Sequence, residues 1–137
     1  MVLPILCAGV LLAADFALRI LARRGKPERT LWDGRIRLER LENTGMAGGV
    51  LKNHPFLARA LPGCALAAML ILCRGELLRG RGLSCWGAAL LCAGGLGNVL
   101  ERLARGRVTD YIRFPGLPGK RLRRLVWNLA DFMLLAG

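Results

Sequence analysis

The chain consists of long apolar runs separated by short basic segments. Residues 2–22 are apolar apart from Asp15 and Arg19, and a helix of this length can cross a hydrocarbon core of about 30 Å. Residues 56–73 and 83–100 form two further apolar runs of sufficient length. This pattern predicts three membrane-spanning helices.

A fourth apolar run closes the chain at residues 125–137 and is less regular. As a helix it would be only about 20 Å long, which is short for a full crossing. It contains Asn128 and Asp131, which lie three positions apart and therefore on one helix face. We predict a fourth helix that crosses a thinned bilayer or lies partly in the interface. The expected fold is an all-α, four-helix transmembrane bundle in a single membrane domain, residues 1–137.

Composition and charge agree with this pattern. Hydrophobic residues make up 54% of the chain and the mean hydropathy is +0.40, yet the formal net charge is +12. The cations are segregated between the apolar runs, with eight Lys and Arg in residues 23–52, three in 74–81 and eight in 102–124. Such flanks are typical of a membrane protein that faces anionic head groups. We therefore expect membrane lipids as partners and no nucleic acid.

The first apolar run is expected to be retained rather than cleaved as a signal peptide. It has no charge before Asp15, and its basic cluster follows the apolar stretch instead of preceding it. The cysteines lie inside the apolar runs without CxxC spacing or histidine partners, so they predict small packing residues and neither a metal site nor a disulfide framework: Cys7, Cys64, Cys73, Cys85 and Cys92.

Several polar side chains interrupt the apolar runs. An ionisable group inside a membrane costs at least about 2.5 kcal/mol on insertion scales, so each needs a partner or a function. Asp15 and Arg19 are spaced i, i+4, where a local ion pair is natural. Glycines in the third run predict close helix packing. A polar stripe with spacing i, i+3, i+4 and i+7 follows these glycines: Asn98, Glu101, Arg102 and Arg105.

Two aspartates suggest chemistry. Asp131 has no cation within the helical turn that follows it, so another segment must compensate its charge. Asp110, in the stretch VTDYI, is the natural partner, although a lone aspartate at a membrane boundary is also typical of a solvated loop. Two buried carboxylates that lie close together share a proton. One can then remove a proton from water while the other polarises a substrate carbonyl.

The sequence resembles lipoprotein signal peptidase, or signal peptidase II, a family of bacterial intramembrane aspartyl proteases. Short motifs in the family's order carry the resemblance: DFALR, ENTGMAGG, GGLGNVLERL, RVTDYI and WNLAD. The resemblance implies that Asp110 and Asp131 are the catalytic aspartates. It implies substrate-binding or supporting roles for the other matched side chains, which are Asp15, Arg19, Asn43, Asn98, Glu101, Arg102 and Asn128.

The resemblance implies a multi-pass protein of the bacterial cytoplasmic (inner) membrane. It also implies that the protein removes the signal peptide from diacylglyceryl-modified prolipoproteins and needs no metal or organic cofactor. Both termini are expected in the cytoplasm, with a small extracytoplasmic platform formed by residues 23–52 and anchored by Trp32. The Lys and Arg count instead favours cytoplasmic first and third connections, but it depends on one short middle loop. We expect a monomer, and we interpret His54 as a boundary residue of the second span.

Three features depart from the family pattern. Glu101 stands where the family has aspartate, Arg19 stands where it has lysine, and the last apolar run is short. Glu101 has one more methylene than aspartate, so its hydrogen bonds must differ from those of the family. Arg19 has a planar guanidinium with several donors in place of the compact ammonium of lysine. These departures leave open a catalytically silent relative that binds lipidated peptides. A small proton-coupled four-helix exporter that uses Asp15 is a further alternative, although Arg19 as a partner argues against it.

Overall fold

The computed structural model describes residues 2–25, 28–45 and 53–137. Its three long helices confirm the first three predicted spans and are each long and apolar enough to cross a membrane. Two extend further than predicted, because α2 and α3 continue through polar residues that hydropathy excludes. The helices are α1 (Leu3–Arg24), α2 (Pro55–Arg79) and α3 (Leu83–Arg105). The predicted connection at residues 74–82 is therefore mostly helical. His54 lies at the N-cap of α2, as predicted.

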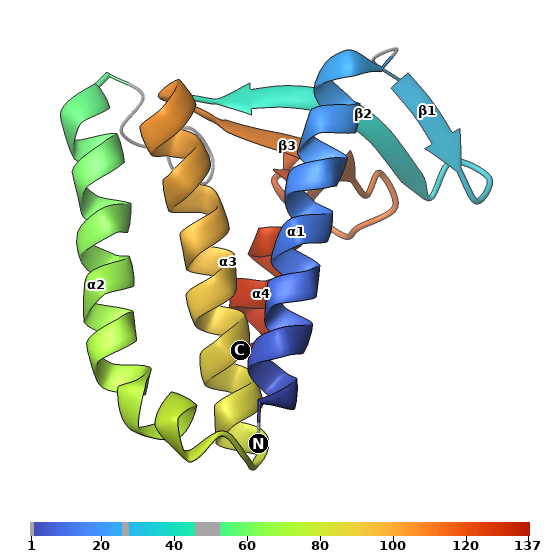
Figure 1. Ribbon diagram of the computed structural model, residues 1–137. Coiled ribbons are helices and arrows are strands. Elements are labelled where there is room, and N and C mark those ends of the chain that lie inside the picture. Colours follow the sequence, from blue (N-terminus) through green and yellow to red (C-terminus); the bar gives the residue numbers. More distant parts are fainter. Residues whose placement is uncertain (1, 26–27, 46–52) are drawn as a thin grey trace.

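The expectation of an all-α, four-helix bundle is wrong in two respects. A four-stranded antiparallel sheet in the order β1-β2-β3-β4 covers one end of the helices (Figure 1). In addition, the final run is not a single helix, because Val126–Trp127 pairs with β3 before a short helix begins. The elements are β1 (Glu28–Leu31), β2 (Ile36–Asn43), β3 (Val108–Arg113), the 3-10 helix η2 (Leu122–Arg124), β4 (Val126–Trp127) and α4 (Leu129–Ala136).

The described parts of the two segments that the sequence gives eight cations each lie at the same end of the bundle. The first leads from α1 into the β1–β2 hairpin, and the second leads from α3 into β3 (Figure 1). Gly106 makes the second turn possible, since it has φ +72°, a left-handed conformation that other residues rarely adopt. The start of α1 and the α2–α3 connection lie at the opposite end. The sheet therefore forms a platform across one end of the helices.

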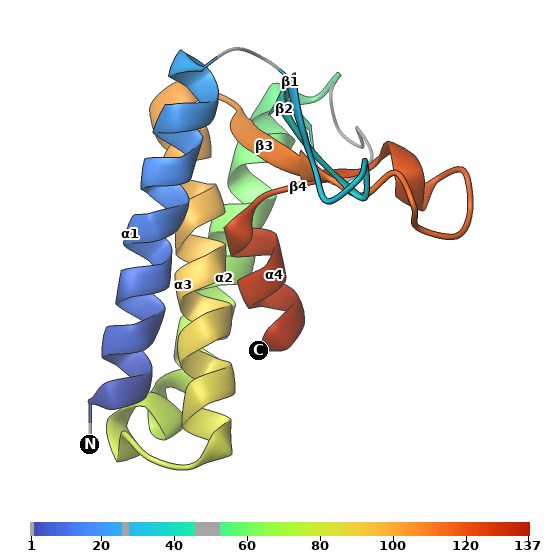
Figure 2. The same ribbon diagram turned by 90° about the vertical axis from the view of Figure 1, so that its right-hand side faces the viewer.

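Helix α3 is the centre of the bundle and packs against α1, α2 and α4 (Figures 1 and 2). Glycines permit the close approach that the sequence predicted. A Cβ atom on Gly94 would lie 2.6 Å from the carbonyl oxygen of Ala130 in α4, and one on Gly97 would lie 3.0 Å from Leu12 in α1. The cysteines divide by environment, because Cys85 is buried whereas Cys64 is exposed and does not pack as predicted.

Replacing Gly94 by alanine is expected to destabilise the protein, because the new Cβ meets backbone that cannot move without displacing α4. Overpacking of this kind typically costs about 1–3 kcal/mol, so we expect thermal unfolding in detergent at a temperature several degrees lower. Gly63→Ala in α2 is the matched control, since its Cβ would meet nothing within 4 Å. Equal unfolding temperatures for the two variants would contradict this packing.

Candidate active site

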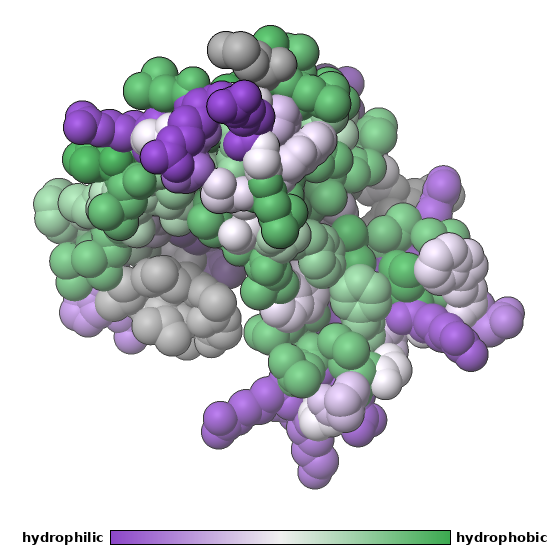
Figure 3. Space-filling view, turned by 90° about the horizontal axis from the view of Figure 1, so that it is seen from below, coloured by the Kyte–Doolittle hydropathy of each residue, from purple (hydrophilic) through white to green (hydrophobic). Residues whose placement is uncertain are grey.

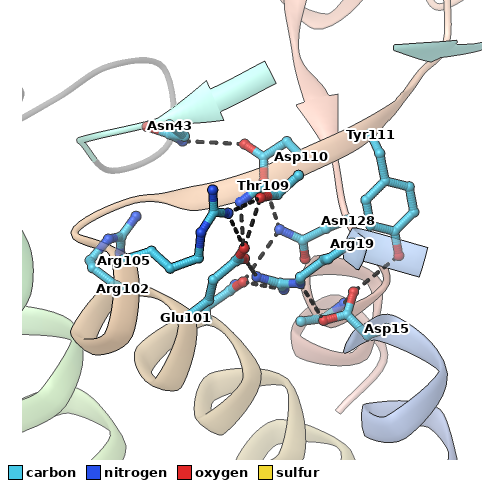
Figure 4. Close-up of polar contacts among 12 residues, drawn as sticks. Asp15, Arg19, Asn43, Glu101, Arg102, Arg105, Thr109, Asp110, Tyr111 and Asn128 are labelled. Carbon is cyan, nitrogen blue, oxygen red and sulfur yellow. Dashed lines mark hydrogen bonds and ion pairs between the residues drawn. The ribbon is translucent and has the colours of Figure 1, made fainter. Parts of the chain in front are cut away.

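Arg19 lies at the centre of a buried polar cluster below the sheet (Figure 4). Its Nε donates to Asp15 Oδ2 at 2.6 Å, and both side chains are 0% exposed. Its Nη1 donates to Glu101 on α3, and its Nη2 donates to Asn98 Oδ1 at 2.8 Å. The predicted i, i+4 ion pair is confirmed. The guanidinium also ties α1 to α3, because each of its three nitrogens binds a different side chain.

Glu101 connects α3 to β3. Its carboxylate accepts hydrogen bonds from the backbone N–H of Thr109 at 3.0 Å and from the Thr109 hydroxyl at 2.7 Å. Arg23 and Arg105 donate to the same carboxylate at 2.7 and 2.9 Å, in addition to Arg19. The longer side chain that departs from the family pattern is therefore fully bonded within this structure.

Asp15 fixes the start of α4. Its Oδ1 accepts from the backbone N–H groups of Leu129 and Ala130 at 3.1 and 3.4 Å. The first N–H groups of a helix have no partner within the helix, and a carboxylate there is also favoured by the helix dipole. Asp15 of the first spanning helix therefore positions the segment that carries Asp131.

Asn128 brings the two candidate catalytic aspartates together. Its Nδ2 donates to Asp110 Oδ1 at 2.7 Å, and its Oδ1 accepts from the backbone N–H of Asp131 at 2.9 Å. The backbone N–H of Asn128 donates to Asp131 Oδ2 at 3.0 Å, which completes a capping box at the start of α4. The three-residue spacing thus encodes a helix start rather than one face of a long helix.

Amide groups from two further segments contact the aspartates. Asn98 Nδ2 donates to Asp131 Oδ1 at 3.0 Å, and Asn43 Nδ2 lies 3.4 Å from Asp110 Oδ2. Arg102, for which a substrate-binding or supporting role was predicted, donates to the carbonyl oxygen of Gly45 at 2.6 Å. Residues 46–49 of the ENTGMAGG motif lie outside the described residues.

Sequence reasoning overlooked Tyr111 and Thr109, which flank Asp110 on β3 and are both buried. The Tyr111 hydroxyl donates to Asp15 Oδ1 at 3.0 Å and accepts from the Leu129 N–H at 3.0 Å. Burial and the Asp15 carboxylate raise the pKa of Tyr111, so the phenol remains a neutral donor. The available signal was that the chain's single tyrosine occurs in an apolar setting, where its hydroxyl needs a partner.

Replacing Tyr111 by phenylalanine is expected to lower the unfolding temperature by a few degrees. The Asp15 carboxylate then loses the hydrogen bond from the phenol, whereas the Leu129 N–H keeps Asp15 as an acceptor. A hydrogen bond to a charged group typically contributes about 1.5–3 kcal/mol. Measurement of Tyr111→Phe, Asp15→Asn and the double variant is the test. Because the phenol and the carboxylate act on the same helix start, their effects should not add. Strictly additive effects would contradict a shared role.

The Asp110 carboxyl has an unusual titration. Burial raises its pKa to about 7, and the charge of Asp131 acts in the same direction. The amides of Asn128 and Asn43 oppose the shift only in part. Asp110 is 4% exposed, so the carboxyl is held in a poorly hydrated position beside a second acid. Two carboxyls in such a setting are suited to hold one proton between them.

Comparison with known proteins identifies the family. The model of the peptidase family described as signal peptidase (SPase) II matches residues 7–137. The chain belongs to the signal peptidase II family. Family membership and the three apolar helices place it in the bacterial cytoplasmic membrane as a multi-pass protein, as predicted.

Curated relatives agree with this family. The lipoprotein signal peptidase of Chlorobium luteolum is 33% identical over 102 residues, which are 70% of this chain and 60% of the relative. That of Nitrobacter hamburgensis is 32% identical over 97 residues, 69% of this chain and 59% of the relative. The chain thus spans about 60% of the length of these relatives. That of Rhodopseudomonas palustris is 30% identical over 148 residues, 98% of this chain and 86% of the relative.

The fold is shared with solved structures. A bacterial membrane enzyme solved by the in meso method at 2.3 Å resolution has a TM-score of 0.79 at 22% identity and covers 96% of this chain and 80% of its own. A second such enzyme, solved at 1.9 Å resolution, has a TM-score of 0.68 at 20% identity. The match covers 96% of this chain and 84% of that enzyme's chain. The arrangement of three long helices, a sheet and the short helix α4 is therefore shared with these two bacterial membrane enzymes.

Proposed function

We propose that this chain is an aspartyl endopeptidase that removes the signal peptide from diacylglyceryl-modified prolipoproteins. Asp110 and Asp131 are its catalytic pair. The observation that carries the proposal is that Asn128 hydrogen-bonds to both aspartates at once, although they come from different elements. Family membership supports the reaction and the substrate class.

In the proposed reaction, the two carboxyls hold one water molecule and one proton. The ionised carboxyl removes a proton from water, whose oxygen attacks the carbonyl carbon of the scissile peptide bond. The protonated carboxyl gives its proton to the carbonyl oxygen as the carbonyl carbon becomes tetrahedral, which forms a gem-diol. When the C–N bond breaks, the proton taken from water passes to the leaving amine, and one hydroxyl of the gem-diol returns its proton to the other carboxylate. The pair then again holds one proton. Its high pKa makes Asp110 suited to hold the shared proton.

The neighbouring amides and ions hold this pair in place. Asn43 and Asn98 each donate to one oxygen of an aspartate, and Asn128 donates to the other oxygen of each. Arg102 is 7% exposed and reaches the platform at Gly45, so we assign it to the alignment of the bound peptide beside the sheet. Fixed donors of this kind stabilise developing charge without rearrangement.

The direct test uses the purified full chain and a synthetic lipopeptide with a diacylglyceryl cysteine. We expect cleavage of the bond that precedes the lipidated cysteine, detected by mass spectrometry of both fragments. The same peptide without lipid is the control and should remain intact. Binding of the lipopeptide without cleavage in several lipid environments would instead support a silent relative.

The exporter alternative is not favoured by the environment of Asp15. A proton carrier needs a carboxylate that can exchange its proton with water. Asp15 is 0% exposed and is held by Arg19, by Tyr111 and by the start of α4. These contacts give Asp15 a structural role.

Cleavage is expected to decline on the alkaline side of about pH 7, because the shared proton leaves Asp110 there.

The stability of the folded chain should also depend on the protonation of Asp110. The folded chain binds a proton at Asp110 between its ordinary pKa of 3.8 and about 7, whereas the unfolded chain does not, so stability falls as pH rises through this window. Unfolding temperatures across this range check the sign, and Asp110→Asn should flatten the slope. A slope of opposite sign, or one unchanged in Asp110→Asn, would contradict the assignment.

A further inference from the structure

Two segments project from the platform and carry cations that form no salt bridge within the described part of the chain. They are the β1–β2 turn with its flanks, residues 29–35, and the β3–β4 loop, residues 116–124. Together we call them the platform rim. Among the described residues, the salt bridges of the platform use Arg37, Arg40, Arg107 and Arg113. None of the salt bridges involves the rim cations, which are Arg29, Arg35, Lys120, Arg121, Arg123 and Arg124.

The rim also exposes large apolar side chains. Trp32 is 76% exposed at the tip of the β1–β2 turn, beside Leu31, and Leu122 is 43% exposed within the cationic loop. Seen from below, apolar side chains cover much of this face, and hydrophilic ones form patches over the α2–α3 connection and at the outer edges of the platform (Figure 3). An exposed tryptophan and leucines among arginines are typical of a surface that lies in a membrane interface.

The level of the platform rim along the long helices follows from the contacts of the segment that leads from the rim into α4. The loop leads through β4 into α4, whose first N–H groups bind Asp15. Asp15 lies nine residues before the last residue of α1, Arg24, which is roughly 13 Å along the helix axis. Both rim segments descend from the sheet toward this level (Figure 2). The rim therefore lies level with the upper part of the long helices rather than beyond their ends.

We propose that the platform rim binds anionic phospholipid head groups of the leaflet beside it. The loop run KRLRR supplies four cations within five residues, at the depth where lipid phosphates are concentrated. Long arginine side chains can extend to phosphates while Trp32 and Leu122 insert among the acyl chains. The loop also joins the strand with Asp110 to the segment with Asp131, so bound lipid would hold the connection between them.

The test measures lipid preference directly and does not depend on peptidase activity. The full chain is reconstituted in phosphatidylcholine vesicles with traces of spin-labelled phosphatidylglycerol or phosphatidylcholine. We expect a several-fold preference for phosphatidylglycerol at low salt, and its loss at about 1 M salt, where the Debye length is about 3 Å. In Arg121→Gln/Arg123→Gln/Arg124→Gln the preference should fall at least about threefold.

The control triple variant is Arg74→Gln/Arg79→Gln/Arg81→Gln, which removes the same charge at the opposite end of the bundle and should keep the preference. An equal loss in both variants would overturn the proposal, because lipid preference would then follow net charge. A wild-type preference that survives high salt would also overturn it. So would inorganic phosphate or a soluble acidic peptide that binds the rim in detergent when phosphatidylglycerol shows no preference in vesicles.

Discussion

Replacement of Asp110 or Asp131 by asparagine is expected to abolish cleavage of the lipopeptide. Asparagine keeps the size of the side chain and can still accept the hydrogen bond from Asn128, but it can neither take a proton from water nor donate an acid proton. Proton transfer by a positioned group typically contributes 10²–10⁴-fold, so we expect kcat to fall by at least about 10²-fold in each single variant. The double variant should be no worse than the singles, because the two carboxyls act as one unit.

Stability measurements separate this loss from misfolding. Burial penalises the charged form of Asp110, so Asp110→Asn should unfold at an equal or higher temperature than wild type at neutral pH. The matched control is Asp33→Asn in the exposed β1–β2 turn, which makes the same chemical change away from the cluster and should leave cleavage unchanged. Retention of more than about a tenth of wild-type kcat in either Asp110→Asn or Asp131→Asn would exclude that residue as a general acid or base.

The spanning helices could be predicted because hydropathy measures the property that positions them. The sheet could not, because its central pairing joins residues far apart in the chain, such as Leu41 with Asp110. Nothing local to either segment specifies this partner. Hydropathy also assigned Val126 and Trp127 to a helix, since a short apolar run has the same composition whether it forms a strand or a helix. Pairing with β3 makes these two residues a strand.

The candidate site was predictable to the level of individual residues but not of their contacts. Polar side chains in apolar runs are conspicuous, and the clustering of Asp15, Arg19, Asn98 and Glu101 in one network agrees with their cost in a membrane. Their connectivity depends on how three helices and a strand meet. The link from Asp15 to the start of α4 exists only because α1 lies against both β3 and α4.

Replacement of Arg19 by methionine is expected to be the most destabilising change in this network. Asp15 and Glu101 would both lose a buried cation, and removal of one partner of a buried ion pair typically costs about 3–5 kcal/mol. Arg79→Met in α2 is the matched control. It also breaks an arginine–carboxylate pair, with Glu76 at 2.8 Å, but its side chain is 71% exposed, so we expect less than about 1 kcal/mol. Thermal unfolding in detergent compares the two, and similar losses would contradict the buried network.

Arg19→Lys tests whether the guanidinium also acts on catalysis through Asn98. The Asn98 Oδ1 accepts from Arg19 Nη2, and because a guanidinium has only donors, this bond turns the Asn98 Nδ2 toward Asp131. Lysine keeps the charge but cannot bind three side chains in fixed directions. The Asn98 oxygen then keeps only the longer bond from Asn128 Nδ2, at 3.3 Å, so the amide is held less firmly in the orientation that directs its Nδ2 to Asp131. We expect kcat to fall at least about tenfold with little change in KM, as for an interaction that matters only in the transition state. A purely structural role for Arg19 predicts instead that folded Arg19→Lys protein retains wild-type kcat.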